Sequence, residues 1–587
     1  MDLLAQTLDP TTQEQATKQL QVASRQPGFT KQLLDFIGQF QTQDFKIIQA
    51  AAILFKNNIK KFWPDENHPA LTKSDRSYIK EHIVKLMLSV NELIRLQLSD
   101  AIATIADSDY PSDWPTLRDE LVTYFSSTNP NHFLGSLATF EAIFRKYSTS
   151  APNDELLTEM LFVLEDYNKF CKPFLELFRK AVDAFTSDPK MKIIQNVILY
   201  SLDIIYHLCS PDLPEFFVQN FKNTSPTENL LVILRTLLIA PDDEPDADRT
   251  DSPSNNLKIK EKVCELLRLY GLKYESDFQP FVDHYLQDVF QLLSSLSDAP
   301  RFDSLTISAT LFLDSIARST HKQRFNNKPV IEAVIKQVCL PLLTYRDEDV
   351  ELTEDDPRQF MLTDLETGLV GESSSRRGAA TELIRALVAV YPADVIAISQ
   401  SLVEGLIASQ DWKVRVSAVL LVLAIGVQKE TPARGATDLV SGVDMIGFFN
   451  GFVKKQLLTQ QSASSPLMLI ICIRFFTVVR SFFPKETVTE VFPVLINFLA
   501  SESFIVHSYA AWAVDKLLVL PSGIEILNNS AHVGQLLDIC FTVFSKKHSN
   551  LNEFVMKLIM SVIASSSNSV LLPHAEKVVH NLLNFSF

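Results

Sequence analysis

Glycine is scarce in this sequence, which has 15 glycines among its 587 residues. That is about a third of average usage. Tight turns between strands and loops that wrap around phosphate groups both need glycine, because a side chain blocks positive φ angles and close backbone approach. Hydrophobic residues nevertheless make up 46% of the chain. The sequence therefore predicts an all-α protein, longer than one hydrophobic core can support.

Cysteine pairs, a leader sequence and long apolar runs are also missing. The N-terminus, Met1–Ala5, has no basic stretch followed by an apolar core, as a signal peptide would. The longest apolar runs, Val416–Val427 and Leu467–Ile473, are too short to cross a bilayer. We therefore expect a soluble intracellular protein without membrane insertion. Six scattered cysteines predict buried free thiols rather than disulfides or zinc ligands: Cys171, Cys209, Cys264, Cys339, Cys472 and Cys540.

Positive charge is in deficit, and no catalytic pattern is visible. The net charge of −16 would repel a phosphate backbone, so we expect no nucleic-acid partner, whereas basic proteins would suit such a surface. The eleven histidines are dispersed, and no Ser-His-Asp, paired-carboxylate or metal-ligand spacing stands out. We predict no enzyme activity, no catalytic residues, no metal and no cofactor.

A loose sequence frame recurs along the chain. A small polar residue is followed by an apolar or long side chain at positions +3 and +4 and an apolar one at +7, which is typical of a helix cap and the buried stripe behind it. The spacings are near multiples of about 42 residues, as in two-helix HEAT repeats. We predict a HEAT-repeat superhelical solenoid of about 13–14 antiparallel helix pairs. The frame starts at Asp44, Asn91, Asn256, Ser373, Asp411 and Ser503.

Two segments near the N-terminus are more specific. Proline and tryptophan in Ile105–Leu117 predict the end of a helix sealed by an aromatic ring. The helix expected from Asp44 to Pro64 has a buried stripe of Ile48, Ala51, Ala52, Phe55 and Ile59. By composition, its other side is a solvated face with lysines near the helix C-terminus, formed by Lys46, Gln49, Lys56, Asn57 and Lys60.

An acidic insert interrupts the helical rhythm between Tyr345 and Leu387. It is interpreted as an insertion between repeats, either a solvated loop or a contact for a basic partner; a cation site at Asp355 and Asp356 is the less favoured alternative. A second acidic stretch, Pro241–Pro253, is expected to be a flexible loop. The acidic residues of the insert are Asp347, Glu348, Asp349, Glu351, Glu354, Asp355 and Asp356.

These segments together resemble the importin-β (karyopherin) superfamily. Members carry a helix like Ala52-x-x-Phe-Lys-Asn-x-Ile-Lys-Lys-x-Trp63, followed by a segment like Ile105–Leu117. The insert narrows the resemblance to the branch that exports importin-α. Its matching segments are Arg346–Pro357, Asp364-Leu-Glu-Thr-Gly and Ser375-Arg-Arg-Gly-Ala-Ala, with further matches at Glu275–Pro280 and Tyr509–Lys516.

The resemblance implies a nuclear export receptor that binds Ran-GTP and importin-α. It would pass Phe-Gly repeat proteins of the nuclear pore and shuttle between nucleus and cytoplasm across the nuclear envelope, with GTP hydrolysis left to Ran. Inner helices of the first repeats would hold Ran, which assigns Gln49, Lys56, Asn57, Lys60, Arg95 and Asp100. The insert would contact Ran and cargo, which assigns Asp347, Glu348, Glu351, Asp355 and Asp356.

Four regions are expected on this basis. They are Ran-binding repeats at 1–125, central repeats with the acidic loop 241–253 at 126–345, the acidic insert and following helix start at 346–380, and further repeats at 381–587. Relatives continue past the part that matches Leu571–Phe587, so a C-terminal arch is expected to be missing. An import receptor of the same superfamily and a generic HEAT scaffold stay open as alternatives.

Overall fold

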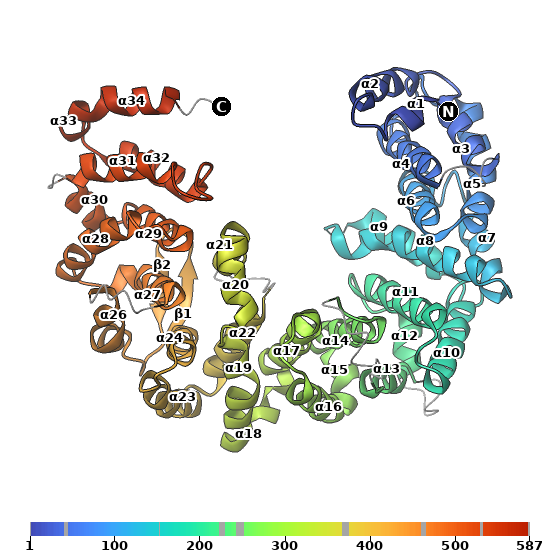
Figure 1. Cartoon of the computed structure of the whole chain (residues 1–587). Coiled ribbons are helices and arrows are strands. Elements are labelled where there is room, and N and C mark those ends of the chain that lie inside the picture. Colours follow the sequence, from blue (N-terminus) through green and yellow to red (C-terminus); the bar gives the residue numbers. More distant parts are fainter. Residues whose placement is uncertain are drawn as a thin grey trace. The chain divides into compact units, whose positions relative to one another are not determined.

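The structure is a computed structural model. It describes residues 2–39, 45–151, 153–221, 229–241, 252–366, 375–458, 465–528 and 532–584. The chain divides into two compact units, unit 1 (Met1–Phe281) and unit 2 (Val282–Phe587). Within each unit, helices stack side by side (Figure 1). The acidic loop expected at 241–253 lies mostly outside the described residues.

Unit 1 is built from helices alone among its described residues. Pairs form between α3 and α4, α5 and α6, α10 and α11, and α13 and α14, whereas α8 packs against the 3-10 turn η1 that follows the short α7. The bounds are α1 (Asp2–Gln6), α2 (Gln13–Ala23), α3 (Phe29–Gln39), α4 (Phe45–Phe62), α5 (Lys73–Ser89), α6 (Glu92–Asp109), α7 (Leu117–Thr123), η1 (Tyr124–Ser126), α8 (Pro130–Thr149), α9 (Asp154–Leu164), α10 (Cys171–Ser187), α11 (Lys192–Cys209), α12 (Glu215–Phe221), α13 (Leu230–Ile239), α14 (Asn255–Lys273), α15 (Glu275–Phe278) and η3 (Gln279–Phe281).

Unit 2 continues the same plan with two additions, an inserted helix pair and a short hairpin of strands. Its bounds are α16 (Val282–Ser295), η4 (Pro300–Phe302), α17 (Asp303–Arg318), η5 (Thr320–Phe325), α18 (Lys328–Ala333), η6 (Val334–Cys339), α19 (Leu340–Leu343), α20 (Asp347–Asp355), α21 (Pro357–Glu366), α22 (Arg376–Val390), α23 (Pro392–Ile407), α24 (Trp412–Gly426), β1 (Val427–Thr431), β2 (Gly435–Leu439), α25 (Met445–Phe448), η7 (Phe449–Val453), α26 (Lys454–Leu458), α27 (Pro466–Val479), η8 (Arg480–Phe482), α28 (Lys485–Leu499), α29 (Phe504–Leu517), α30 (Pro521–Asn528), α31 (His532–Val543), α32 (Glu553–Ser565), α33 (Asn568–Leu571), η9 (Leu572–His574) and α34 (Ala575–Asn584).

Within each unit, the inner helix of a pair forms the core, because it packs against its own partner and against the neighbouring inner helix of that unit. In α24, every residue from Val416 to Gly426 is buried. Such a helix shows no amphipathic pattern, since neighbours cover it all round. The predicted stripe on α4 is confirmed, with Ile48, Ala51, Ala52, Phe55 and Ile59 all buried.

The predicted helix starts are confirmed in part. Asn91 caps α6 by accepting a hydrogen bond from the Ile94 amide at 3.2 Å, and Asp411 caps α24 in the same way. Ser503 occupies the cap position of α29 without a side-chain bond. Asn256 was wrong as a start, because Ser254 caps α14. Asp44 and Ser373 lie outside the described residues.

The number of repeats is lower than expected. Within the described ranges there are eleven successive inner helices: α4, α6, α8, α11, α14, α17, α22, α24, α27, α29 and α32. The ten steps from Phe45 to Glu553 average about 51 residues, longer than the repeat length typical of the class. Dividing the length by 42 overestimates the count, because added elements such as α20, α21 and the strands lengthen several repeats.

A two-stranded hairpin is the one departure from helical structure among the described residues, which otherwise confirm the predicted all-α class. β1 and β2 pair antiparallel with an irregular register and follow α24 directly. Gly435 closes the turn with φ of +72°, and a Cβ there would lie 2.3 Å from the Val478 carbonyl oxygen. The turn therefore needs glycine both for its backbone conformation and for its close approach to α27.

The six cysteines are all free and buried, as predicted. Burial raises the pKa of the Cys171 and Cys540 thiols to about 12, so both are protonated and unreactive at neutral pH. Among the described residues, none of the helices combines the length and apolar composition needed to span a bilayer.

Acid should destabilise unit 2 through His507 of α29. Its Nδ1 lies 3.1 Å from the Ser501 carbonyl oxygen, and burial lowers its pKa to about 4. Because the folded pKa is below the ordinary value of about 6.5, the unfolded chain takes up a proton first as pH falls. The stability that the neutral ring provides is complete above pH 6.5 and is lost progressively down to about pH 4.

The check is the thermal unfolding midpoint between pH 7 and pH 4 for the parent and for His507→Gln, which cannot titrate. The parent should lose on the order of 3 kcal/mol more over this range. Carboxylates titrate in both proteins, so the difference between the two curves isolates the histidine. Parallel curves would contradict the prediction.

Candidate functional site

One face of α4 displays most of the residues assigned to Ran. Gln49, Lys56 and Lys60 follow each other at helical spacing, together with the exposed Ile53. Asn57 is exposed beside them. Their accessibility suits a contact surface, and their assignment to a partner stays a prediction. We call Gln49, Ile53, Lys56 and Lys60 the α4 stripe.

Charged side chains continue from this stripe across the neighbouring inner helices. Lys56 lies 3.8 Å from Asp100 of α6, so the structure brings two of the predicted residues together. On α8, Arg145 forms a bidentate pair with Glu141, and on α11 Asp203 pairs with Lys262 of α14 at 3.1 Å. We call this run the charged ridge: Lys56, Asp100, Glu141, Arg145, Asp203 and Lys262.

Glu141 is the most strongly held carboxylate of the charged ridge. Burial opposes its charge, but hydrogen bonds to His207 and Arg145 keep its pKa below the ordinary value. His207 Nε2 lies 3.4 Å from Glu141, and its Nδ1 lies 2.7 Å from the Ser148 hydroxyl. Glu141 and Arg145 are therefore held in place before any partner binds, which lowers the entropy lost on binding.

Arg95 occupies a different place from the surface contact expected for it. It is 5% exposed, and its guanidinium donates to the Val90 carbonyl and to Asn131 Oδ1 at 2.8 Å. In this structure it joins α6 to the start of α8. Sequence spacing could not separate it from the exposed residues of α6, because a long arginine can reach inward or outward from the same position.

The two N-terminal signature segments meet in the structure. Trp63, which ends the α4 signature, is buried and donates its indole N–H to Asp109 at 3.0 Å. Lys80 of α5 donates to the other oxygen of Asp109 at 2.7 Å, and Arg76 stacks over the Trp63 ring. Trp63 therefore closes the end of α4 and connects it to the end of α6.

The acidic insert is helical, which corrects its interpretation as a solvated loop. α20 and α21 form a helix pair, and α20 sorts its acids by face. Asp349 points inward, where it accepts from the Arg346 amide at 2.9 Å and from Arg377 at 3.2 Å. All five residues assigned to the insert contact are exposed: Asp347, Glu348, Glu351, Asp355 and Asp356. Glu354 is exposed as well.

The exposed side of α20 is negative over its whole length. By helical geometry, Asp347, Glu351 and Glu354 share one stripe, and Glu348 and Asp355 flank it. Asp347 pairs with Lys413 of α24 at 2.6 Å yet is 89% exposed. A partner with basic side chains would meet a fixed row of carboxylates here. The contact with a partner stays a prediction.

Asp364 of α21 anchors the inserted pair, and the sequence alone did not single it out as an anchor. Its carboxylate is fully buried and accepts from Tyr345 at 3.0 Å, from Arg474 of α27 at 3.1 Å and from the Tyr509 hydroxyl. Arg377 of α22 lies 3.6 Å away. We call these five residues the Asp364 cluster.

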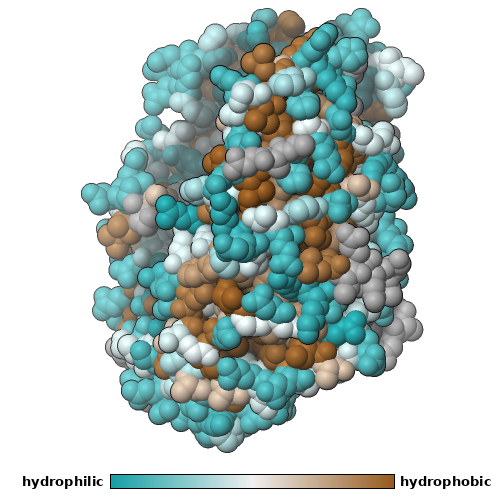
Figure 2. All heavy atoms as spheres, turned by 90° about the vertical axis from the view of Figure 1, so that its left-hand side faces the viewer, coloured by the Kyte–Doolittle hydropathy of each residue, from teal (hydrophilic) through white to brown (hydrophobic). Residues whose placement is uncertain are grey.

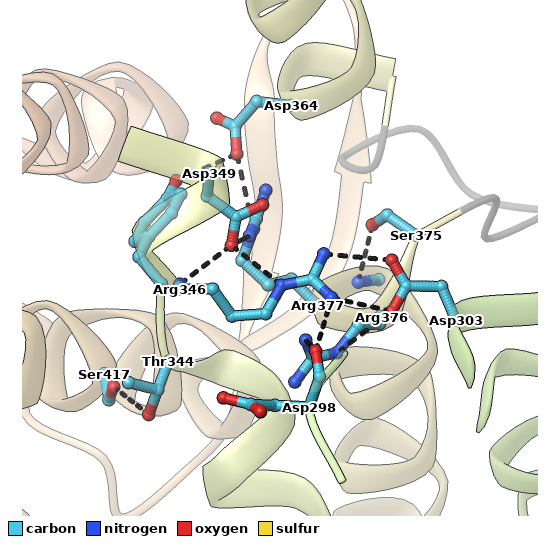
Figure 3. Close-up of polar contacts among 12 residues, drawn as sticks. Asp298, Asp303, Thr344, Arg346, Asp349, Asp364, Ser375, Arg376, Arg377 and Ser417 are labelled. Carbon is cyan, nitrogen blue, oxygen red and sulfur yellow. Dashed lines mark hydrogen bonds and ion pairs between the residues drawn. The ribbon is translucent and has the colours of Figure 1, made fainter. Parts of the chain in front are cut away.

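A second ion-pair group lies next to the Asp364 cluster (Figure 3). Arg346 makes a bidentate pair with Asp303 of α17, both contacts at 2.9 Å, and Arg377 connects the two groups by reaching Asp349. Arg376 lies 3.9 Å from Asp303. The Ser375-Arg-Arg segment noted in the sequence is therefore the part of unit 2 that ties the insert to α17.

The charges of the Asp364 cluster are mutually dependent. Burial opposes ionisation of Asp364, but Arg474 and Arg377 hold its pKa below the ordinary value. Burial also opposes charge on Arg377, yet Tyr345, Asp349 and Asp364 raise its pKa overall. Each group is stable in its charged form because the others are present. Among the described residues, no group of histidine, cysteine and acidic side chains is arranged to hold a metal.

Stacked helix pairs of this kind are typical of helical-repeat proteins. A family model of the importin-β N-terminal domain matches residues 16–89, which places the chain among the helical-repeat proteins of the importin-β type. The Cse1 family model matches residues 143–514, which is more than half of the chain. The chain therefore belongs to the Cse1 family.

Individual relatives agree with this assignment. The chain is 29% identical to "Importin-alpha re-exporter" of Schizosaccharomyces pombe and 29% identical to "Exportin-2" of Pagrus major, over 99% and 94% of its length. It is similar to the solved structure of the exportin Cse1 in its cargo-free, cytoplasmic state, with a TM-score of 0.87 and 26% identity over the whole chain. The matches cover 61%, 57% and 63% of those proteins. These relatives are named as transport receptors, not as enzymes.

Removing the charge of Asp364 should destabilise unit 2. Asp364→Asn keeps the shape of the side chain but leaves Arg377 and Arg474 buried without their shared counter-charge. Breaking a buried pair in this way costs about 3–5 kcal/mol. The thermal unfolding midpoint should fall, and the amides of α21 should exchange with deuterium faster.

The matched control is Asp347→Asn on the same insert. Its pair with Lys413 is exposed, so its loss should change stability by about 0–1 kcal/mol. Equal effects of the two substitutions would show that the insert does not depend on the buried carboxylate.

Proposed function

We propose that this protein is a nuclear export receptor that carries importin-α from the nucleus to the cytoplasm together with Ran-GTP. The observation that carries the proposal is the match to the Cse1 family over residues 143–514. The names of the relatives and the similarity to a cargo-free exportin support it. In this function the protein shuttles through the nuclear pores of the nuclear envelope, and it needs no catalytic site of its own.

Two surfaces are the proposed contacts. The α4 stripe with the first part of the charged ridge binds Ran, and the exposed acids of α20 bind Ran and cargo. Both surfaces lie on helices whose positions are fixed by buried contacts, so the arrangement of their charges is also fixed. Such patterns raise association rates and select the correct partner more than they add affinity.

Phe-Gly repeat proteins of the pore are the third proposed partner. On the face shown in Figure 2, hydrophobic residues lie among hydrophilic ones at the surface. Exposed apolar residues of unit 2 include Leu458 at the end of α26, Phe482 of η8 and Val519 before α30. Small apolar patches of this kind suit many weak contacts with phenylalanine side chains, as rapid passage through a pore requires.

Reversing one charge of the α4 stripe should weaken Ran binding. Lys60 is exposed near the end of α4, and Lys60→Glu would place a negative charge against whatever acid it meets. Affinity for Ran-GTP should fall roughly tenfold, which corresponds to about 1.4 kcal/mol. The measurement is equilibrium binding to Ran loaded with a non-hydrolysable GTP analogue, with Ran-GDP as the nucleotide control.

Lys61→Glu is the matched control, because Lys61 is adjacent and exposed but turned away from the stripe by about 100°. Equal losses of Ran affinity in the two variants would show that the α4 stripe is not the contact. If the parent protein bound Ran-GTP and Ran-GDP equally well, the proposed function as a whole would be contradicted.

Reversing charge on α20 should impair assembly with cargo. Glu348→Lys combined with Glu351→Lys would replace two exposed carboxylates without touching Asp349 or Asp364. The complex with Ran-GTP and importin-α should form roughly tenfold less tightly, and more weakly as salt rises, because exposed charges are screened. Size-exclusion chromatography and calorimetry of the three-protein mixture would measure it.

The control for this pair is Glu404→Lys with Glu486→Lys, which makes the same charge change at exposed positions of α23 and α28. If the control lowers assembly as much as the α20 variant, net charge and not the insert governs the interaction.

A further inference from the structure

Unit 2 contains a cavity that none of the proposed contacts uses. Its volume is about 620 Å³, within the range of ligand pockets. The walls come from α21, α22, α24, the strands, α27, α29 and α32. The exposed face of α20 and the charged ridge do not contribute to it. The inserted helix α21 forms one wall, so the Asp364 cluster also fixes the shape of this cavity.

Much of the wall is apolar. Leu365 of α21, Leu423 of α24 and Phe554 of α32 line it together with Trp512 of α29. Trp512 is half-buried, and its ring packs edge-on against Tyr509, with centroids 5.9 Å apart. An apolar or aromatic side chain would gain free energy by leaving water for this space.

The polar part of the wall is strongly basic. Six basic residues line the cavity against two acidic ones, Glu430 and Asp515, in a chain whose net charge is −16. The basic residues fall into two groups. Arg377, Arg385 and Arg474 already pair with carboxylates of the fold. Arg480, Lys516 and Lys557 are less compensated.

Arg480 is the most unusual of these cations. It is 3% exposed, and its guanidinium donates to backbone carbonyls of Thr477, Lys516 and Ala433 rather than to a carboxylate. Within the described ranges, no acid lies at ion-pair distance from it or from the exposed Lys557. Asp515 acts on Arg480 electrostatically without forming an ion pair with it, and a buried cation that is compensated so weakly favours the approach of an anion. Among the residues that the structure describes, the acid that pairs with Lys516 is its chain neighbour Asp515, at 3.1 Å.

We propose that this cavity is a docking pocket for an acidic peptide segment with an apolar anchor residue. The anchor occupies the space beside Trp512 and Leu423, and flanking carboxylates of the peptide face Lys516, Lys557 and Arg480. The basic residues of the wall favour a peptide with negative charge. The apolar part of the wall favours a ligand that also carries an apolar side chain, which a free inorganic anion does not have. The proposal concerns a site separate from the Ran and cargo surfaces and does not depend on them.

The test uses the full chain and a fluorescein-labelled probe, acetyl-Asp-Glu-Glu-Phe-Glu-Asp-amide, followed by fluorescence anisotropy. Binding in the micromolar range is expected. Replacing the probe's Phe by Ser, or its acids by Lys, should weaken binding at least tenfold. Inorganic phosphate should compete only through ionic strength. Competition by phosphate at constant ionic strength would overturn the proposal in favour of a simple anion site.

Variants locate the probe. Lys557→Glu should weaken binding about tenfold, whereas Lys547→Glu, an equally exposed lysine outside the cavity, should have no effect. Thr381→Trp, which fills the cavity from α22, should abolish binding, and Trp512→Phe should remove the change in tryptophan fluorescence on binding. An unchanged thermal midpoint shows that each variant is folded. Equal binding by the Lys557 and Lys547 variants, or no binding by the parent, would overturn the proposal.

Discussion

The buried carboxylate of Asp364 is the interaction on which unit 2 depends. It lies 110 residues from Arg474 and 145 from Tyr509 along the chain, yet bonds to both. Burying the charge of Arg377 or of Arg474 without a partner would be energetically unfavourable, and burying the charge of Asp364 alone would be unfavourable too. Their mutual neutralisation makes one arrangement of α21, α22, α27 and α29 far more favourable than any other. The inserted helix pair is therefore a fixed part of the unit.

This arrangement divides the acid of the insert into two roles. Asp349 and Asp364 point inward and form ion pairs with arginines, whereas Glu348 and Glu351 remain on the surface. Surface carboxylates recognise partners best when the helix that displays them cannot move. The same logic applies in unit 1, where the Trp63–Asp109 contact fixes α4 and α6 beneath the charged ridge.

The local features of the fold could be predicted from sequence. Apolar spacing identified the buried face of α4, small polar residues identified the starts of α6 and α24, and scattered cysteines indicated buried thiols. Each depends on residues within one or two helical turns, where chain geometry alone decides which side chains share a face. The predicted partner residues Lys56 and Asp100 also came together, because successive inner helices lie side by side.

The sequence by itself thus determined the helical class, the repeated pairs, the resemblance to a transport family and the acidic character of the insert. Only the tertiary structure decided that the acidic run is a helix, that Arg95 turns inward while Lys60 faces out, and that Asp364 is the anchor. It also created the cavity beside Trp512. An acidic composition by itself predicts a solvated loop. Here the segment is a packed helix because arginines elsewhere in the chain neutralise its buried carboxylates. The contact between Asp364 and Arg474 joins residues more than a hundred positions apart, which no local sequence pattern encodes.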